Sequence, residues 1–174
     1  MQRFARGVDQ VLNPVLMMKR MLLSAVVFAA GCQYDPFAHE FTSNRPADGS
    51  VAGRYVPEDD TARRLRTRFK IEVSSESEVL LNTDGTFLAR NLPHCWYNTF
   101  DCVPGSEAWQ GTWALKQHQD WWAVALHITS RNGNQTSYGI PMMIRGDASP
   151  YLLHLTIGDP DSGGALAFRR KSPP

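Results

Sequence analysis

From about residue 50 onward, apolar and polar residues alternate along much of the chain. The clearest case is the stretch 64–73, in which Leu65, Thr67, Phe69, Ile71 and Val73 are separated by charged residues. A period of two predicts a strand with one buried face. Extended along the chain, the pattern predicts eight or nine short strands, at 52–56, 65–73, 79–82, 86–89, 109–116, 121–129, 136–145, 151–157 and 165–170.

Turn-forming residues separate these strands. Asp84-Gly85 supplies the positive backbone dihedrals of a tight hairpin, and further turn chemistry lies at 119–120, 132–134, 146–150 and 158–160. Pro141 cannot donate a ladder hydrogen bond, so it marks a sheet edge or a bulge. The acidic-then-basic run from Glu58 to Arg66 predicts one helical turn at most.

Short strands with brief connections predict an all-β domain. We expect residues 51–171 to form a small antiparallel up-and-down β-barrel of 8–9 strands, with 172–174 as a tail. A sandwich is the alternative. Closure favours the barrel, because a closed barrel has no exposed sheet edges.

The N-terminal part has a different pattern. Two cations at 19–20 precede a ten-residue apolar run, 21–30, and small residues then lead to Cys32. This order is typical of a secretory signal peptide, and the run is half the ~20 residues that a transmembrane helix needs. We therefore expect residues 1–31 to be a signal peptide. Residues 1–17 do not fit the n-region of a signal peptide, and we expect them to be an untranslated upstream extension.

The four residues Ala29-Ala30-Gly31-Cys32 resemble the lipobox of bacterial lipoproteins. This resemblance implies cleavage before Cys32 and a diacylglycerol on its sulfur. Gln33, in place of Asp, implies sorting to the outer membrane. We therefore expect a lipid-anchored protein on the periplasmic side of the outer membrane, with residues 32–50 as a flexible tether. A buried helix with a buried cysteine is the alternative.

Three cysteines are an odd number for an exported protein. If Cys32 carries the lipid, Cys95 and Cys102 remain and would close a short disulfide loop in an oxidising compartment. Two free thiols are one alternative. A metal held with the adjacent His94 is another, although no second Cys/His pair follows at the spacing of a zinc site.

A family resemblance rests on four short motifs: Gly53-Arg54-Tyr55, Asp84-Gly85-Thr86-Phe87, Gly111-Thr112-Trp113 and Asp159-Pro160-Asp161. Together they resemble small bacterial lipoproteins with a lipocalin-like β-barrel, over residues 51–171. Members of this group mostly lack an assigned activity. The resemblance therefore implies a fold and little chemistry.

Composition and motifs narrow the class of function. The formal net charge of +1 gives no general attraction to nucleic acid, and we expect no such partner. Asp161-Ser162-Gly163-Gly164 looks like a protease nucleophile stretch, but it has neither a suitable histidine nor a two-barrel scaffold. His127 and His154 could be cross-strand neighbours, yet the histidines show no ligand spacing. We therefore expect no enzyme activity, no cofactor and no metal.

Aromatic residues are the leading candidates for ligand contact. Trp113, Trp122 and Tyr151, chosen for aromatic area alone, would line a cavity for an apolar ligand if the barrel interior is not filled. A packed core with one surface aromatic is the alternative.

The strongest charge feature is a row of cations. On the predicted strand, Arg64, Arg66, Arg68 and Lys70 share one face and could contact phosphates or anionic lipid headgroups. An ordinary solvated strand face is the alternative.

These observations favour a non-enzymatic binder of a small apolar or amphiphilic molecule, within the barrel or at its mouth. The alternative is an envelope interaction or structural protein with a filled barrel, which uses the cationic row or a sheet edge against a partner. A cavity of ligand size favours the first hypothesis, and a filled interior favours the second.

Overall fold

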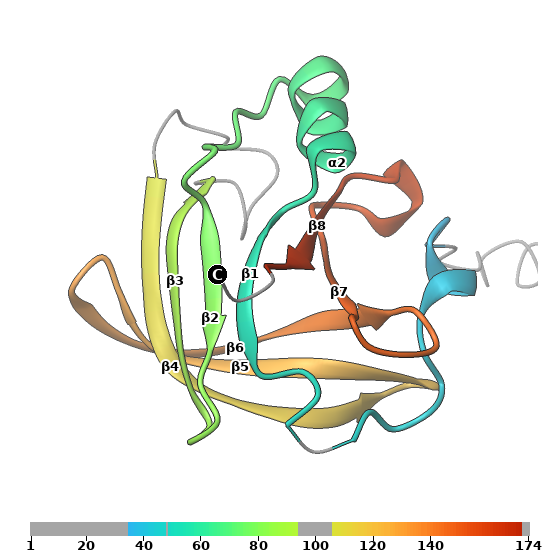
Figure 1. The fold of residues 1–174 in the computed structure, drawn as a ribbon. Coiled ribbons are helices and arrows are strands. Elements are labelled where there is room, and N and C mark those ends of the chain that lie inside the picture. Colours follow the sequence, from blue (N-terminus) through green and yellow to red (C-terminus); the bar gives the residue numbers. More distant parts are fainter. Residues whose placement is uncertain (1–34, 48, 94–105, 172–174) are drawn as a thin grey trace, which may run out of the picture. The chain divides into compact units, whose positions relative to one another are not determined.

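Eight antiparallel strands follow one another around a closed barrel (Figure 1). The computed structural model describes residues 35–47, 49–93 and 106–171, all of which belong to the unit Tyr34–Pro174. The strands are β1 (Gly53–Pro57), β2 (Glu78–Leu81), β3 (Thr86–Pro93), β4 (Ser106–His118), β5 (Trp121–Arg131), β6 (Asn134–Arg145), β7 (Leu152–Thr156) and β8 (Ala165–Arg170).

Each strand pairs with the next, and β1 closes the barrel against β8. The closing register places Tyr55 opposite Arg170, Val56 opposite Arg169 and Pro57 opposite Phe168. The expected small all-β barrel is therefore confirmed.

Turn residues fix the hairpins where the sequence predicts them. The β5–β6 hairpin has a two-residue loop, Asn132-Gly133, with φ of 50° and 81°. Both dihedrals are positive, as a type I′ turn requires. Gly85 (φ 82°) completes the β2–β3 turn, in which the Asn82 N–H donates to the Thr86 carbonyl at 2.9 Å.

The strand predicted at 65–73 is wrong. Helix α2 (Asp59–Arg64) continues into the π-helical turn η2 (Leu65–Phe69), which ends at Lys70 with φ 59°. The prediction of one helical turn at most is wrong for the same reason.

The sequence of this stretch is ambiguous between two periods. Ala62, Leu65 and Phe69 recur at helical spacing and pack against the core, while the exposed Thr67 occupies a position that a strand would bury. Acidic residues at the start of α2 and arginines at its end also stabilise a helix, because they interact favourably with the helix dipole. The terminal charges and the packing of the residues at helical spacing both favour the helix.

The barrel interior is occupied by side chains. Every strand contributes buried apolar side chains to one cluster, which also contains Leu65, Ile71 and Val73 from the segment after α2. The largest fully buried side chains include Tyr55, Trp109, Phe168, Leu126 and Ile144. The described part of the chain thus has a packed core where the sequence left an open lumen as one possibility.

One stretch of β6 lies at an open edge. β6 pairs with β5 along most of its length, but with β7 only from Met143 to Arg145. Pro141 is exposed, lies opposite Ala125 and precedes the part of β6 that pairs with β7. The sequence predicted an edge or a bulge at Pro141, and the structure has an edge there.

Residues 35–45, which belong to the segment expected as a tether, pack against the outer wall of the barrel. Phe41 forms a bridge with Arg145 on β6 and, together with Phe37, packs beside Ala123 and Met143. The Thr42 N–H donates to the carbonyl of Ile144 at 2.9 Å.

Cys32, Cys95, Cys102, His94 and the expected signal peptide lie outside the described residues. Within the described ranges, no helix has the length and apolar character needed to cross a membrane.

Candidate functional site

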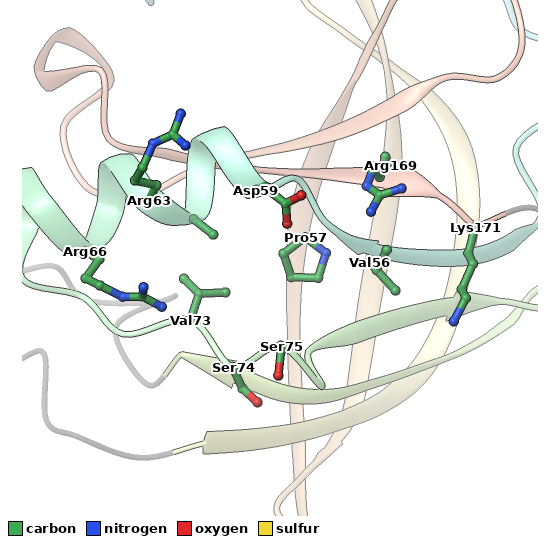
Figure 2. A pocket seen from close by; sticks show the side chains of 11 residues that line it. Val56, Pro57, Asp59, Arg63, Arg66, Val73, Ser74, Ser75, Arg169 and Lys171 are labelled. Atoms are coloured by element: carbon green, nitrogen blue, oxygen red, sulfur yellow. The ribbon is translucent and has the colours of Figure 1, made fainter.

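A groove of about 600 Å³ lies where β1 leads into α2 (Figure 2). We call it the α2 groove. Its walls come from β1, α2, the segment before β2 and the end of β8, and it is lined by Val56, Pro57, Asp59, Ala62, Arg63, Arg66, Val73, Ser74, Ser75, Arg169 and Lys171.

Backbone and side-chain hydrogen bonds hold α2 against β8. The Glu58 N–H donates to the carbonyl of Ala167 at 2.8 Å. The buried Thr61 hydroxyl accepts from the Ala167 N–H at 3.2 Å and donates to the Glu58 carbonyl at 3.0 Å. Because both partners sit on regular elements, the groove is built on a fixed scaffold.

The floor of the groove is apolar. Val56 and Pro57 belong to the last part of β1, Ala62 lies on α2, and Val73 is buried next to the exposed Ser74 and Ser75. Figure 2 shows these side chains around one space, with α2 on one side and the two serines on the other. An apolar floor with polar groups around it is typical of a small-molecule site.

The rim is cationic, but its four cations differ in their partners. Arg63 pairs with Asp60 at 2.6 Å, and Arg66 pairs with Glu72 at 2.9 Å. Among the described residues, the side chains of Arg169 and Lys171 form no hydrogen bond or ion pair. They are therefore the cations most available to a ligand.

The cations predicted to form a row do not share a face. Arg64 lies over the ring of Phe37 at 5.5 Å, Arg68 lies over Phe69 at 5.3 Å, and the Lys70 ammonium donates to the Thr67 carbonyl at 3.1 Å. Only Arg66 lines the groove. On a helix, alternate residues point in different directions, whereas residues three apart, such as Arg63 and Arg66, lie on one side.

The three aromatic residues predicted to bind a ligand do not line the α2 groove. Trp113 and Trp122 are half-buried on the inner face of β4 and β5, and Tyr151 is buried in the core. Trp113 lies opposite Leu126, four positions along β5 from Trp122. At about 3.3 Å per residue, the backbone positions of the two tryptophans are separated by roughly 13 Å along the strand direction.

Polar contacts explain part of this aromatic placement. The Trp113 Nε1 donates to the Asn82 carbonyl at 2.9 Å, and the Arg45 guanidinium lies 5.6 Å from the Trp122 ring. Their role in ligand contact stays a prediction.

The two histidines proposed as cross-strand neighbours are not neighbours. His127 on β5 is exposed, lies opposite Gly139 and is 3.3 Å from the Ser137 hydroxyl, whereas His154 lies on β7, with β6 between the two strands. Within the ranges that the structure covers, no three His, Cys, Asp or Glu residues gather as metal ligands would.

The Asp159 turn has the structural role that its sequence predicts. Its carboxylate accepts from the Asp161 N–H at 3.0 Å, and Pro160–Ser162 form one 3₁₀ turn before β8.

Sequence reasoning missed most residues of the groove. Arg169 and Lys171 belong to a short basic run, Arg169-Arg170-Lys171, at the end of the last strand, and this run was the available signal. Val56, Ser74 and Ser75 carry no such signal, because only barrel closure brings them beside β8.

No protein-family model matches this chain, and no curated protein or solved structure matches it either.

Proposed function

We propose that this protein is a non-enzymatic binder of a small amphiphilic molecule, anchored as a lipoprotein on the periplasmic side of the outer membrane. The observation that carries the proposal is the α2 groove: about 600 Å³, with an apolar floor and a polar rim. This volume is within the range of ligand pockets in proteins. The groove lies between α2 and the wall formed by β1 and β8, beside the packed core, so the proposal places the ligand there and not inside the barrel.

The packed core argues against a ligand deep inside the barrel. Tyr55, Leu65 and Phe168 have 0% exposure and belong to one cluster that spans β1, η2 and β8. Inserting a ligand among them would require the core to open, and interiors at native density do not accommodate added groups without strain.

Calorimetric titration with octyl glucoside, a neutral amphiphile, tests the groove. Ser75→Trp fills it from an exposed position and Ala62→Trp fills it from α2. We expect both variants to weaken binding at least about tenfold, since the tail loses the apolar surface that it buries. The control is Ala114→Trp, which adds the same side chain at an exposed position of β4 outside the groove.

The proposal is wrong if octyl glucoside does not bind the unmodified chain, or if Ser75→Trp binds it as tightly while its thermal unfolding is unchanged. The lipid anchor has its own test. The intact mass of the membrane-extracted protein is expected to correspond to a chain that begins at Cys32, carries acyl groups and has an oxidised Cys95–Cys102 pair. An uncleaved, unacylated chain would refute the anchor.

A second candidate function, interaction with an envelope protein, is supported by the open edge of β6. Residues 134–142 have no β7 partner, so an extended segment of another protein could add to this edge. A photo-crosslinker at the exposed Gln135, used in living cells, tests this alternative. It predicts a defined protein adduct at Gln135, whereas ligand binding in the groove predicts none there.

A further inference from the structure

We infer that the molecule bound in the α2 groove carries an anionic oxygen head, of the phosphate monoester or carboxylate class, beside a single short apolar tail. This inference rests on the proposed function and specifies the ligand's chemistry. The structural observation behind it is the unequal pairing of the cations around the groove.

Two of the four cations are already neutralised by close carboxylates. Arg63 and Arg66 each have an acidic partner within 2.9 Å, so they add little net field at the groove. The side chains of Arg169 and Lys171 have no partner within the part of the chain that the structure describes. A ligand can therefore engage these two without breaking an existing ion pair.

The two cations come from one short stretch of chain and lie on one side of it. Arg169 is an exposed residue of β8 opposite Val56, and Lys171 follows two positions later, where its N–H donates to the Arg54 carbonyl at 2.8 Å. In an extended chain, residues two apart point to the same face. Both side chains thus reach the groove from the β8 wall, next to the apolar floor (Figure 2).

The opposite wall supplies hydroxyl donors. The Ser74 Oγ accepts from the Glu76 N–H at 3.1 Å, which leaves its own hydrogen free to donate. Ser75 is exposed and also lines the groove. Guanidinium, ammonium and hydroxyl donors around one space form a set that anionic oxygens accept from.

One carboxylate opposes this set. Asp59, in the first turn of α2, also lines the groove and is exposed. It disfavours anions, so its removal is expected to strengthen the binding of an anionic head. Loss of Asp59 should therefore raise the affinity for an anionic head, whereas loss of Arg169 and Lys171 should lower it.

The test compares four probes by calorimetry on the full chain: octyl phosphate, octyl glucoside, inorganic phosphate and vesicles of phosphatidylglycerol. We expect octyl phosphate to bind at least about tenfold more tightly than octyl glucoside, because charge-assisted hydrogen bonds are the stronger class. Arg169→Gln combined with Lys171→Gln should remove this advantage, so that octyl phosphate binds no more tightly than octyl glucoside. Asp59→Asn should tighten octyl phosphate binding by a few fold. Rising salt should weaken octyl phosphate binding only.

The matched control is Lys116→Glu, which changes the net charge by the same two units at an exposed position of β4 outside the groove. It is expected to leave the advantage of octyl phosphate intact. Loss of that advantage in the control would show that net charge alone sets the preference, and would overturn the inference.

The remaining outcomes separate the two proposals. If octyl phosphate and octyl glucoside bind equally, the inference of an anionic head is wrong, and the proposal that the groove binds an amphiphile is retained. If neither amphiphile binds, both proposals fail. If inorganic phosphate binds as tightly as octyl phosphate, the tail contributes no affinity, and the inference of an apolar tail is overturned. If only vesicles of phosphatidylglycerol bind, and the double variant abolishes this, the headgroups of a lipid surface are the source and the small-molecule inference is overturned.

Discussion

The burial of His154 predicts how the stability of the barrel depends on pH. This side chain on β7 has 0% exposure, and neither ring nitrogen has a hydrogen-bond partner in the described residues. Phe37 and Phe41 cover its ring, with ring centroids 4.8 and 5.1 Å away. Burial, and secondarily the positive charge of Arg145, lowers the pKa of His154 to about 3 from an ordinary 6.5.

A lowered histidine pKa destabilises the fold in acid. Above pH 6.5 the side chain is neutral in both the folded and the unfolded state, so it contributes nothing to pH dependence. Below pH 6.5 the unfolded chain binds a proton that the folded chain excludes, down to about pH 3. Each pH unit in this window costs about 1.4 kcal/mol. At pH 4.5, two units below the ordinary pKa, the free energy of unfolding is therefore lower by about 2.7 kcal/mol.

Urea unfolding at pH 7.0 and pH 4.5 measures this contribution. His154→Leu removes the titrating group and two unpaired buried nitrogens, so we expect it to be at least as stable as the unmodified protein at pH 7.0. Between pH 7.0 and 4.5, the free energy of unfolding of His154→Leu should fall by about 2.7 kcal/mol less than that of the unmodified protein. Carboxylates titrate in both proteins, and the difference isolates the histidine.

His127→Leu is the matched control, because His127 is exposed on β5. Its loss of stability between the two pH values should equal that of the unmodified protein. An equal fall for His154→Leu and the unmodified protein would refute the reasoning, as would an NMR titration of His154 with a midpoint near 6.5.

Two further predictions concern the packing of the long strands. Gly111→Ala would place a Cβ 1.9 Å from the backbone oxygen of His127, so we expect a loss of about 3 kcal/mol or more in the free energy of unfolding, measured with urea. In the control Gly139→Ala, the Cβ would lie 3.6 Å from its nearest atom, so stability should change by less than about 1 kcal/mol. Equal losses in the two variants would contradict the close approach at Gly111. Glu107 has a fully buried side chain and accepts from the Arg131 Nε at 3.0 Å. Glu107→Gln should lower the free energy of unfolding by about 2 kcal/mol, since the charge partner of Arg131 is lost, and a thermal midpoint equal to that of the unmodified protein would show that the pair contributes nothing.

The barrel could be predicted from sequence because its signals are local. Alternation along each strand and turn residues such as Asn132-Gly133 act over two to ten positions. The helix at 59–69 was missed because Leu65 and Phe69 suit both periods. Choosing between them required the tertiary packing of Leu65 and Phe69 against the core, which no local pattern encodes.

The α2 groove could not be predicted because its parts lie far apart in the sequence. Val56 meets Arg169 only through the closing register of β1 and β8, which no local pattern encodes. The burial of His154 was missed for a similar reason, since it depends on Phe37 and Phe41 from a stretch without periodicity.

The α2 groove as the ligand site is the central claim, and methyl NMR of the full chain tests it most directly. With octyl glucoside added, the account predicts that the methyl signals of Val56, Ala62 and Val73, which line the groove, shift in a saturable way. Those of Val124 and Leu126, inside the packed barrel, should not. Shifts confined to Val124 and Leu126 would place the ligand inside the barrel and contradict the account.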